Sequence, residues 1–196
     1  MGERSQIYVR YNQGCINEEK KKGLIANYYG WNYGERMISR ARWGIEWIND
    51  NLKYGLSFYN MKPNVIKMSR IFDTNFDMKD IVFSIDIIEN YHREFPEADF
   101  NEFVFKGQAN NAGKLLVDIE EDCIKYAFLD WETDPKNIMD GEAYMIWNRG
   151  EKWRASQYLS ETAVTACEDN IKKISELAKL MTEEEVEEFM NYDYEE

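Results

Sequence analysis

Cysteine and histidine are scarce in this sequence of 196 residues, which contains three cysteines and one histidine. Cys15, Cys123 and Cys167 are widely spaced and odd in number, which argues against the disulfide framework of a small secreted domain. They and His92 do not have the spacing of a zinc site. We therefore expect no metal or other cofactor, and we interpret the cysteines as small buried side chains.

Long hydrophobic runs are also missing. The longest apolar stretches are too short to cross a bilayer, and the first ten residues, MGERSQIYVR, lack the apolar segment of a signal peptide. We therefore expect a cytoplasmic protein without a membrane partner.

Familiar catalytic and nucleotide-binding motifs are absent from the chain as well. It contains no Walker loop, no GxGxxG, no GxSxG and no HExxH sequence. We therefore predict no catalytic residues, and we favour a binding protein over an enzyme.

Positive charge is rare after the first third of the sequence. Residues 1–62 carry a net charge of +4, and residues 63–196 carry −17, for a total of −13. The last fifteen residues include eight acids and no base. Such a surface repels nucleic acid and attracts a basic protein, although acidic charge also serves solubility alone. We predict a basic protein partner and no direct binding of nucleic acid.

Hydrophobic periodicity places the first elements. Alternating residues predict strands at 5–12 and 24–31, paired as a hairpin, and an apolar stripe predicts a helix at 35–53. A second helix is expected at about 64–72, after Pro63. The spacing over 77–94 favours a helix, with a buried strand at 81–88 as the alternative.

Three strands are predicted next, at 102–106, 114–120 and 123–131, joined as a meander. Residues 132–159 suggest loops and a short helix. Ser160 is placed to cap a helix whose apolar seam is internal or supports a homodimer through 160–181. Thr182 and Glu185 match a capping box for a last helix, and we expect the acidic tail 191–196 to fray.

These elements indicate an α+β fold. The prediction is one domain over residues 1–196, with an antiparallel sheet of about five strands and four or five packed helices. A weak subdivision falls near residues 96–101.

Arginine and aromatic residues gather around the first long helix. Because guanidinium groups bind phosphate and aromatic rings stack on bases, this cluster is a candidate nucleotide site. The other interpretations are a core-facing stripe and a hot spot for a protein partner. The cluster comprises Tyr28, Tyr29, Trp31, Arg36, Arg40, Trp43 and Trp47.

Acidic residues gather around the second and third strands of the predicted meander. They indicate an exposed face that binds a partner or, alternatively, carboxylates that hold Mg²⁺ for phosphoryl chemistry. The set comprises Asp118, Glu120, Asp122, Asp130, Glu132 and Asp134.

Two blocks near the start, GERSQIYVRYN and LIANYYGWNYGERMISRAR, carry a family likeness. They resemble a family of small uncharacterised proteins of phages and prophages of Gram-positive bacteria, which implies a phage setting in the host cytoplasm and brings no active site. By analogy, our main hypothesis is an acidic phage protein that inhibits a host defence or nucleic-acid-handling protein, as anti-CRISPR proteins do. The alternatives are a protein that sequesters a nucleotide signal and a metal-dependent nuclease or phosphodiesterase.

Overall fold

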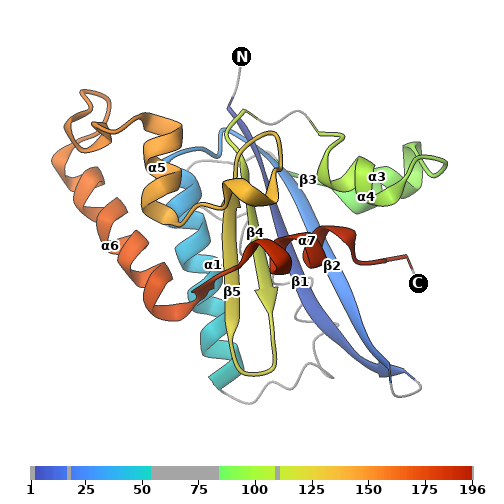
Figure 1. Ribbon diagram of the computed structural model, residues 1–196. Coiled ribbons are helices and arrows are strands. Elements are labelled where there is room, and N and C mark those ends of the chain that lie inside the picture. Colours follow the sequence, from blue (N-terminus) through green and yellow to red (C-terminus); the bar gives the residue numbers. More distant parts are fainter. Residues whose placement is uncertain (1–2, 17–18, 54–83, 109–110, 196) are drawn as a thin grey trace.

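The computed structural model describes residues 3–16, 19–53, 84–108 and 111–195. Within these residues, six strands form one sheet in the order β3-β2-β1-β4-β5-β6, with helices on both faces (Figure 1). The predicted α+β class is confirmed in this coarse form.

The sheet is built on two hairpins. β1 (Arg4–Ile16) and β2 (Glu19–Gly30) pair antiparallel, as predicted, and so do β4 (Lys114–Ile119) and β5 (Ile124–Leu129). Both sides of β4 are buried, which explains its nearly continuous apolar sequence.

The prediction of a wholly antiparallel sheet is wrong. β1 lies parallel to β4, and β5 lies parallel to β6 (Lys179–Leu180). A parallel pair requires a long crossover, and the two crossovers here carry helices. Periodicity within a strand does not report the direction of its neighbour.

The predicted strand at 102–106 is also wrong, because these residues lie in helix α4 (Phe100–Phe105). The carboxylate of Asp99 caps this helix by accepting a hydrogen bond from Glu102 N. Without this strand there is no meander, and β6 supplies the strand beside β5. In the 77–94 region, β3 (Ser84–Asp86) precedes α3 (Ile87–Glu94), so the predicted helix holds in part. The alternative, a buried strand at 81–88, is wrong in its burial, because Ile85 in β3 is 38% exposed. The predicted helix at 64–72 and residues 77–83 lie outside the described residues.

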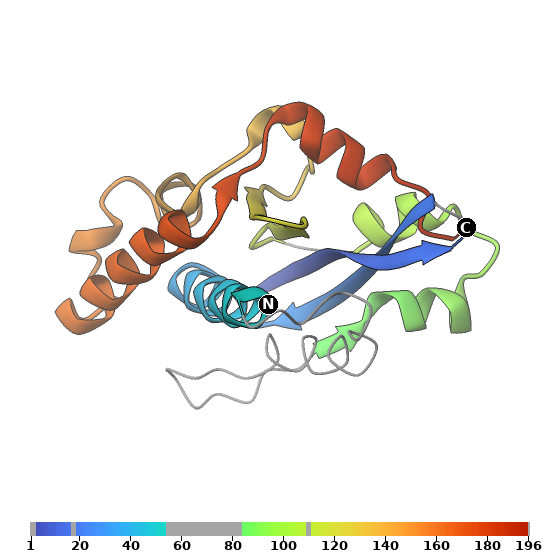
Figure 2. The ribbon, with the colours of Figure 1, turned by 90° about the horizontal axis from the view of Figure 1, so that it is seen from below.

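Helices cover the two faces of the sheet separately. α1 (Glu35–Lys53), α5 (Gly141–Arg149) and α6 (Glu161–Leu177) enclose one core, and α3, α4 and α7 (Glu183–Asn191) enclose the other. Figure 2 shows α1 and α7 on opposite sides of the strands. Short 3-10 turns, η2 (Pro135–Asn137) and η3 (Trp153–Ala155), complete the connections.

The predicted ends of three helices are confirmed. α1 has the predicted bounds, Ser160 caps α6 by accepting from Ala163 N, and Thr182 and Glu185 form the predicted capping box of α7. The apolar seam predicted over 160–181 is divided: Cys167 and Ile174 pack in the first core, whereas Met181 packs in the second.

Candidate functional site

Helix α7 is fixed to the second face of the sheet by apolar and ionic contacts. Val186 and Phe189 are fully buried against that face. Two bases on the strands reach the helix: Arg10 Nη1 lies 3.1 Å from Glu188, and Lys125 Nζ lies 2.7 Å from Glu185. The hydrogen bond from Lys125 to Glu185 raises the pKa of Lys125. One side of α7 is therefore held firmly.

The outward side of α7 carries only negative charge. Glu183, Glu184, Glu187 and Glu188 are exposed, and Glu188 retains 66% of its side-chain surface. Within the described residues, Glu183, Glu184 and Glu187 have no basic side chain at ion-pair distance. The pairs at 183/187 and 184/188 are one helical turn apart, where like charges cost about 0.2–0.5 kcal/mol each. A cation from outside the chain would remove this repulsion.

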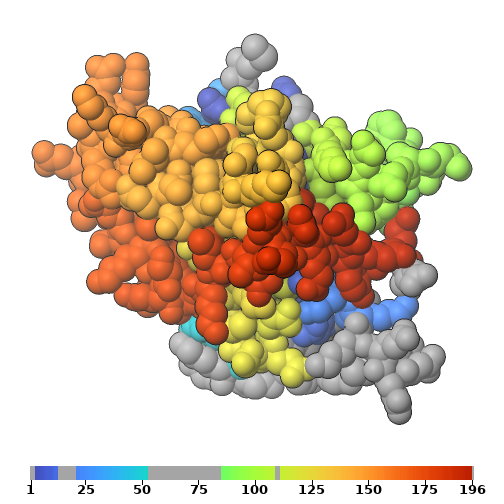
Figure 3. Space-filling model, viewed as in Figure 1, coloured from blue at the N-terminus to red at the C-terminus, as the bar shows by residue number. Residues whose placement is uncertain are grey.

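The 3-10 turn η2 lies beside the negative surface of α7. η2 packs against α7, and Figure 3 shows the loop after β5 directly beside α7 on one side of the molecule. Glu132 in the loop is exposed, whereas the Asp134 carboxylate is half-buried and accepts from Lys136 N at 2.9 Å. We call Glu183, Glu184, Glu187 and Glu188 the acidic face.

More carboxylates lie where α7 runs into the tail. Desolvation and the negative charges of Glu195 and Asp99 raise the pKa of Tyr91, whose hydroxyl donates to the carbonyls of Pro96 and Ala98. Tyr194 donates to the Phe189 carbonyl at 2.6 Å, so the tail is tied back onto α7. The negative potential therefore continues along the chain beyond the helix.

The six acids singled out in the sequence do not form one surface. Asp118 is 2% exposed and binds Arg10 through two contacts, at 2.9 and 2.6 Å, so it lies in the second core rather than on an exposed strand face. Burial opposes the positive charge of Arg10, but the hydrogen bond and the negative charge of Asp118 outweigh this effect and raise the pKa of Arg10. The Glu120 carboxylate pairs with Lys22 at 3.2 Å. Neither carboxylate is left open for a metal ion.

The remaining acids divide between two places. Asp130 is buried and accepts from the backbone of Glu132 and Thr133, so it shapes the loop after β5. Glu132 is exposed in the loop after β5, and Asp134 caps η2, the turn that packs on α7. Asp122 is exposed at the turn between β4 and β5, at the other end of the sheet.

The arginine and aromatic cluster is largely structural. Arg40 is 4% exposed, its Nε donates to Asn32 at 3.0 Å, and its guanidinium lies 4.9 Å from the Tyr29 ring. These contacts occupy the inside of the α1 layer, where a phosphate has no access. The other members differ in exposure: Tyr28, Arg36, Trp43 and Trp47 are half-buried, and Trp31 is 57% exposed.

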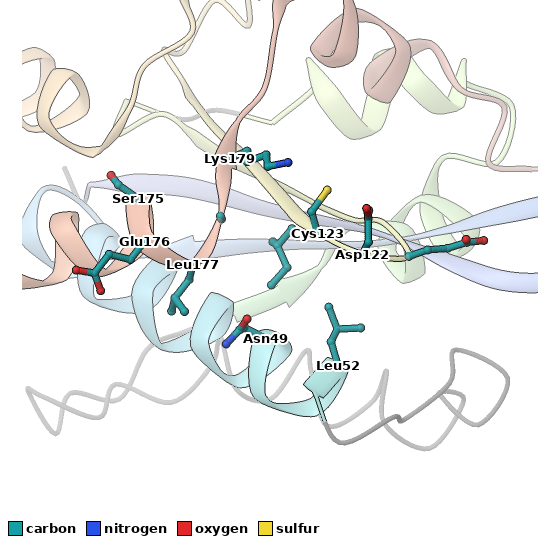
Figure 4. Close-up of a pocket in the computed structure, with 11 residues that line it drawn as sticks. Asn49, Leu52, Asp122, Cys123, Ser175, Glu176, Leu177 and Lys179 are labelled. Carbon is teal, nitrogen blue, oxygen red and sulfur yellow. The ribbon is translucent and has the colours of Figure 1, made fainter.

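A groove of about 600 Å³ opens between the β4–β5 turn and the ends of two helices (Figure 4). Asn49 and Leu52 line it from α1, Ser175 and Glu176 from α6, and Asp122 from the turn. Three carboxylates, of Glu121, Asp122 and Glu176, and two helix C-termini make the groove electronegative, although Lys179 also lines it. Cys123 also lines the groove. Its thiol is unsuited to nucleophilic attack, because desolvation and the charge of Asp122 raise the pKa of Cys123.

Sequence reasoning missed the outward glutamates of α7 as a site. It had found the acidic end of the chain and the capping box separately. Once the capping box fixes the start of the helix, and Val186 and Phe189 define its buried side, the glutamates at 183, 184, 187 and 188 must face outward. Combining the two signals would have located this surface.

No protein-family model, curated protein or solved structure matches this chain. Among the described residues, no three His, Cys, Asp or Glu side chains gather as a metal ion would require. None of the helices in the same residues is long and apolar enough for a membrane span.

Proposed function

We propose that this protein binds a basic protein through the acidic face. The observation that carries the proposal is the outward side of α7, where Glu183, Glu184 and Glu187 are exposed with no base of the described chain paired to them. The other side of the helix is anchored, so these charges are presented in a fixed arrangement. A preorganised binding surface avoids much of the entropy cost of association.

The chemistry of the face specifies the partner. A field of one sign accelerates association with a body of opposite charge, and it repels phosphate backbones. A protein that handles nucleic acid carries the basic surface that such a face attracts. Together with the resemblance to phage proteins, this supports a role as a phage inhibitor of a host defence or nucleic-acid-handling protein, similar to an anti-CRISPR protein.

The test is a comparison of captured host proteins between two variants of equal charge. One variant neutralises the outward side of α7 through E183Q, E184Q and E187Q. The control neutralises three exposed acids elsewhere, through E151Q, E161Q and D169N. Both variants lose three negative charges, so general electrostatics change equally. Glu185 and Glu188 are kept because they hold α7 to the sheet.

The expected result is a basic host protein that the wild-type protein and the control capture and the α7 variant does not. Its association with the purified wild-type protein should weaken steeply as salt is raised, because exposed charges are screened. Equal capture by both variants, or association that is insensitive to salt, would contradict the proposal.

A further inference from the structure

A glutamine side chain is buried in the second core without a hydrogen-bond partner. Gln6 in β1 has no exposed surface, and neither its Nε2 nor its Oε1 is bonded to any group in the part of the chain that the structure describes. A flip of the amide exchanges the two atoms and leaves both unpaired. Because a buried polar atom that loses its hydration needs a replacement, such unpaired groups are rare in folded proteins.

The neighbour of Gln6 on the adjacent strand is a buried lysine. β1 and β4 pair in parallel with Gln6 opposite Lys114, and Lys114 has no exposed surface. On its other side Gln6 is paired with Tyr28, which packs on the second core. Lys114 is paired with Leu129, which belongs to that core. Since opposed residues share a face of the sheet, both polar side chains project from adjacent positions into the second core.

The ammonium group of Lys114 is only partly satisfied by the protein. Its Nζ donates to the Trp131 carbonyl at 3.4 Å and to the Thr133 hydroxyl, both within residues 130–134, which we call the Trp131 loop. An ammonium group has three protons, so one remains. Among the described residues no carboxylate lies at ion-pair distance from this Nζ, although the charge of Asp130 acts on it. Unused donors and an unused acceptor therefore meet in one part of the second core.

We propose that Gln6 and Lys114 hold ordered water in the second core. A water molecule that bridges the two side chains accepts from Lys114 Nζ and donates to Gln6 Oε1, and Gln6 Nε2 can donate to a second water. Buried waters in proteins make about three hydrogen bonds each, to polar groups that the chain leaves unpaired. The site is separate from the acidic face and does not depend on the proposed function.

Other occupants fit this chemistry less well. A small anion would pair with Lys114, but it has no proton to donate to Gln6 Oε1, and the negative charge of Asp130 acts at the same place. A metal cation would be repelled by the ammonium group. An apolar ligand would leave every unpaired atom unpaired. Water both donates and accepts, which is the combination that these two side chains require.

A second buried amide shows that burial alone does not leave such a group unpaired in this fold. Asn32 also has no exposed surface, yet its Nδ2 donates to Ser5 Oγ at 2.7 Å and its Oδ1 accepts from Arg40 Nε at 3.0 Å. The protein itself satisfies this amide. We therefore expect ordered water beside Gln6 and none beside Asn32.

The test is ¹⁷O magnetic relaxation dispersion of water in solutions of the full-length protein, which counts the water oxygens held inside and does not respond to exchanging protons. Gln6→Met removes both amide atoms at nearly constant side-chain volume. Leu116→Met is the control, because Leu116 is fully buried in the same core, two positions from Lys114. The wild-type protein and Leu116→Met should hold the same number of long-lived waters, and Gln6→Met at least one fewer.

An equal count in the wild-type protein and Gln6→Met would overturn the inference. A high-resolution crystal structure of the wild-type protein gives a second measurement that does not require the variant to fold. Density about 3 Å from both the Gln6 amide and Lys114 Nζ would support ordered water. Direct contact between the Gln6 amide and another side chain would contradict it. An anomalous signal at this position in crystals grown in bromide would identify an anion instead and would equally refute the assignment.

Discussion

Replacing Lys114 with methionine probes the buried amine beneath the Trp131 loop. Lys114 has no exposed surface, and burial lowers its pKa from 10.5 to about 8, with Asp130 opposing part of this effect. The folded protein therefore binds the proton of this lysine less tightly than the unfolded chain does. Below pH 8 both states are protonated, and the folded state bears the full cost of a buried charge. Above pH 8 the folded state sheds the proton first, so its stability rises with pH.

The size of this effect follows from the two pKa values. Between pH 7 and about pH 9.5, the lysine should add about 2 kcal/mol to the free energy of unfolding, since one pKa unit corresponds to about 1.4 kcal/mol. Lys114→Met removes this gain. At pH 7 the variant avoids a charge penalty of about 3 kcal/mol but loses the hydrogen bonds to Thr133 and to the Trp131 carbonyl, each worth about 1 kcal/mol. We expect Lys114→Met to be about 1–2 kcal/mol more stable than wild type at pH 7.

Urea unfolding of both proteins across this pH range measures the prediction. The difference between wild type and Lys114→Met cancels the titration of the cysteines and tyrosines, which both chains share. The stability advantage of the variant at pH 7 should shrink with rising pH and be gone by about pH 9.5. A constant difference would mean that Lys114 titrates alike in both states, and the reasoning on its burial would be wrong.

Two further predictions concern stability. Arg10→Met should lower the free energy of unfolding, measured in urea, by about 3–5 kcal/mol, because it leaves Asp118 buried without its partner. Lys22→Met removes a partly exposed ion pair with Glu120 and should cost about 1 kcal/mol or less. Similar losses in the two variants would contradict this contrast. Gly113→Ala should lower Tm far more than Gly150→Ala. Both glycines have a positive φ. A Cβ at Gly113 would lie 2.5 Å from a carbonyl oxygen of β5, whereas a Cβ at Gly150 would meet nothing within 4 Å. Equal losses of Tm in the two variants would refute the steric argument.

Local patterns predicted those elements whose boundaries are chemically marked. The stripe of Met37, Ile45 and Ile48 defines α1, and all three side chains are buried in the first core. The capping box defines the start of α7 for the same reason, since a helix end must satisfy its own backbone groups. In the segment 102–106, by contrast, the alternation of a short apolar run suits either a strand or one helical turn, and the cap at Asp99 lies just outside it.

Long-range pairing was beyond the reach of sequence patterns. Asp118 shares a predicted strand face with Glu120, as an exposed strand residue would, and its burial depends on Arg10, which is 108 positions away. Arg40 posed the same difficulty, because its partner Asn32 is a turn residue with no distinguishing pattern. The charge imbalance of the chain was visible from the start. Which acids face outward depended on knowing the surface against which α7 packs.

The position of α7 in the chain has a consequence for how the protein is made. The second face of the sheet contains strands from residue 4 onward, yet the helix that seals it spans residues 183–191. Since synthesis runs from the N-terminus, a ribosome-bound chain lacks that cover until α7 has left the exit tunnel. Until then, Tyr8, Leu116 and the Arg10–Asp118 pair on that face lack the helix that later shields them, and chaperones or aggregation would compete with completion of the fold.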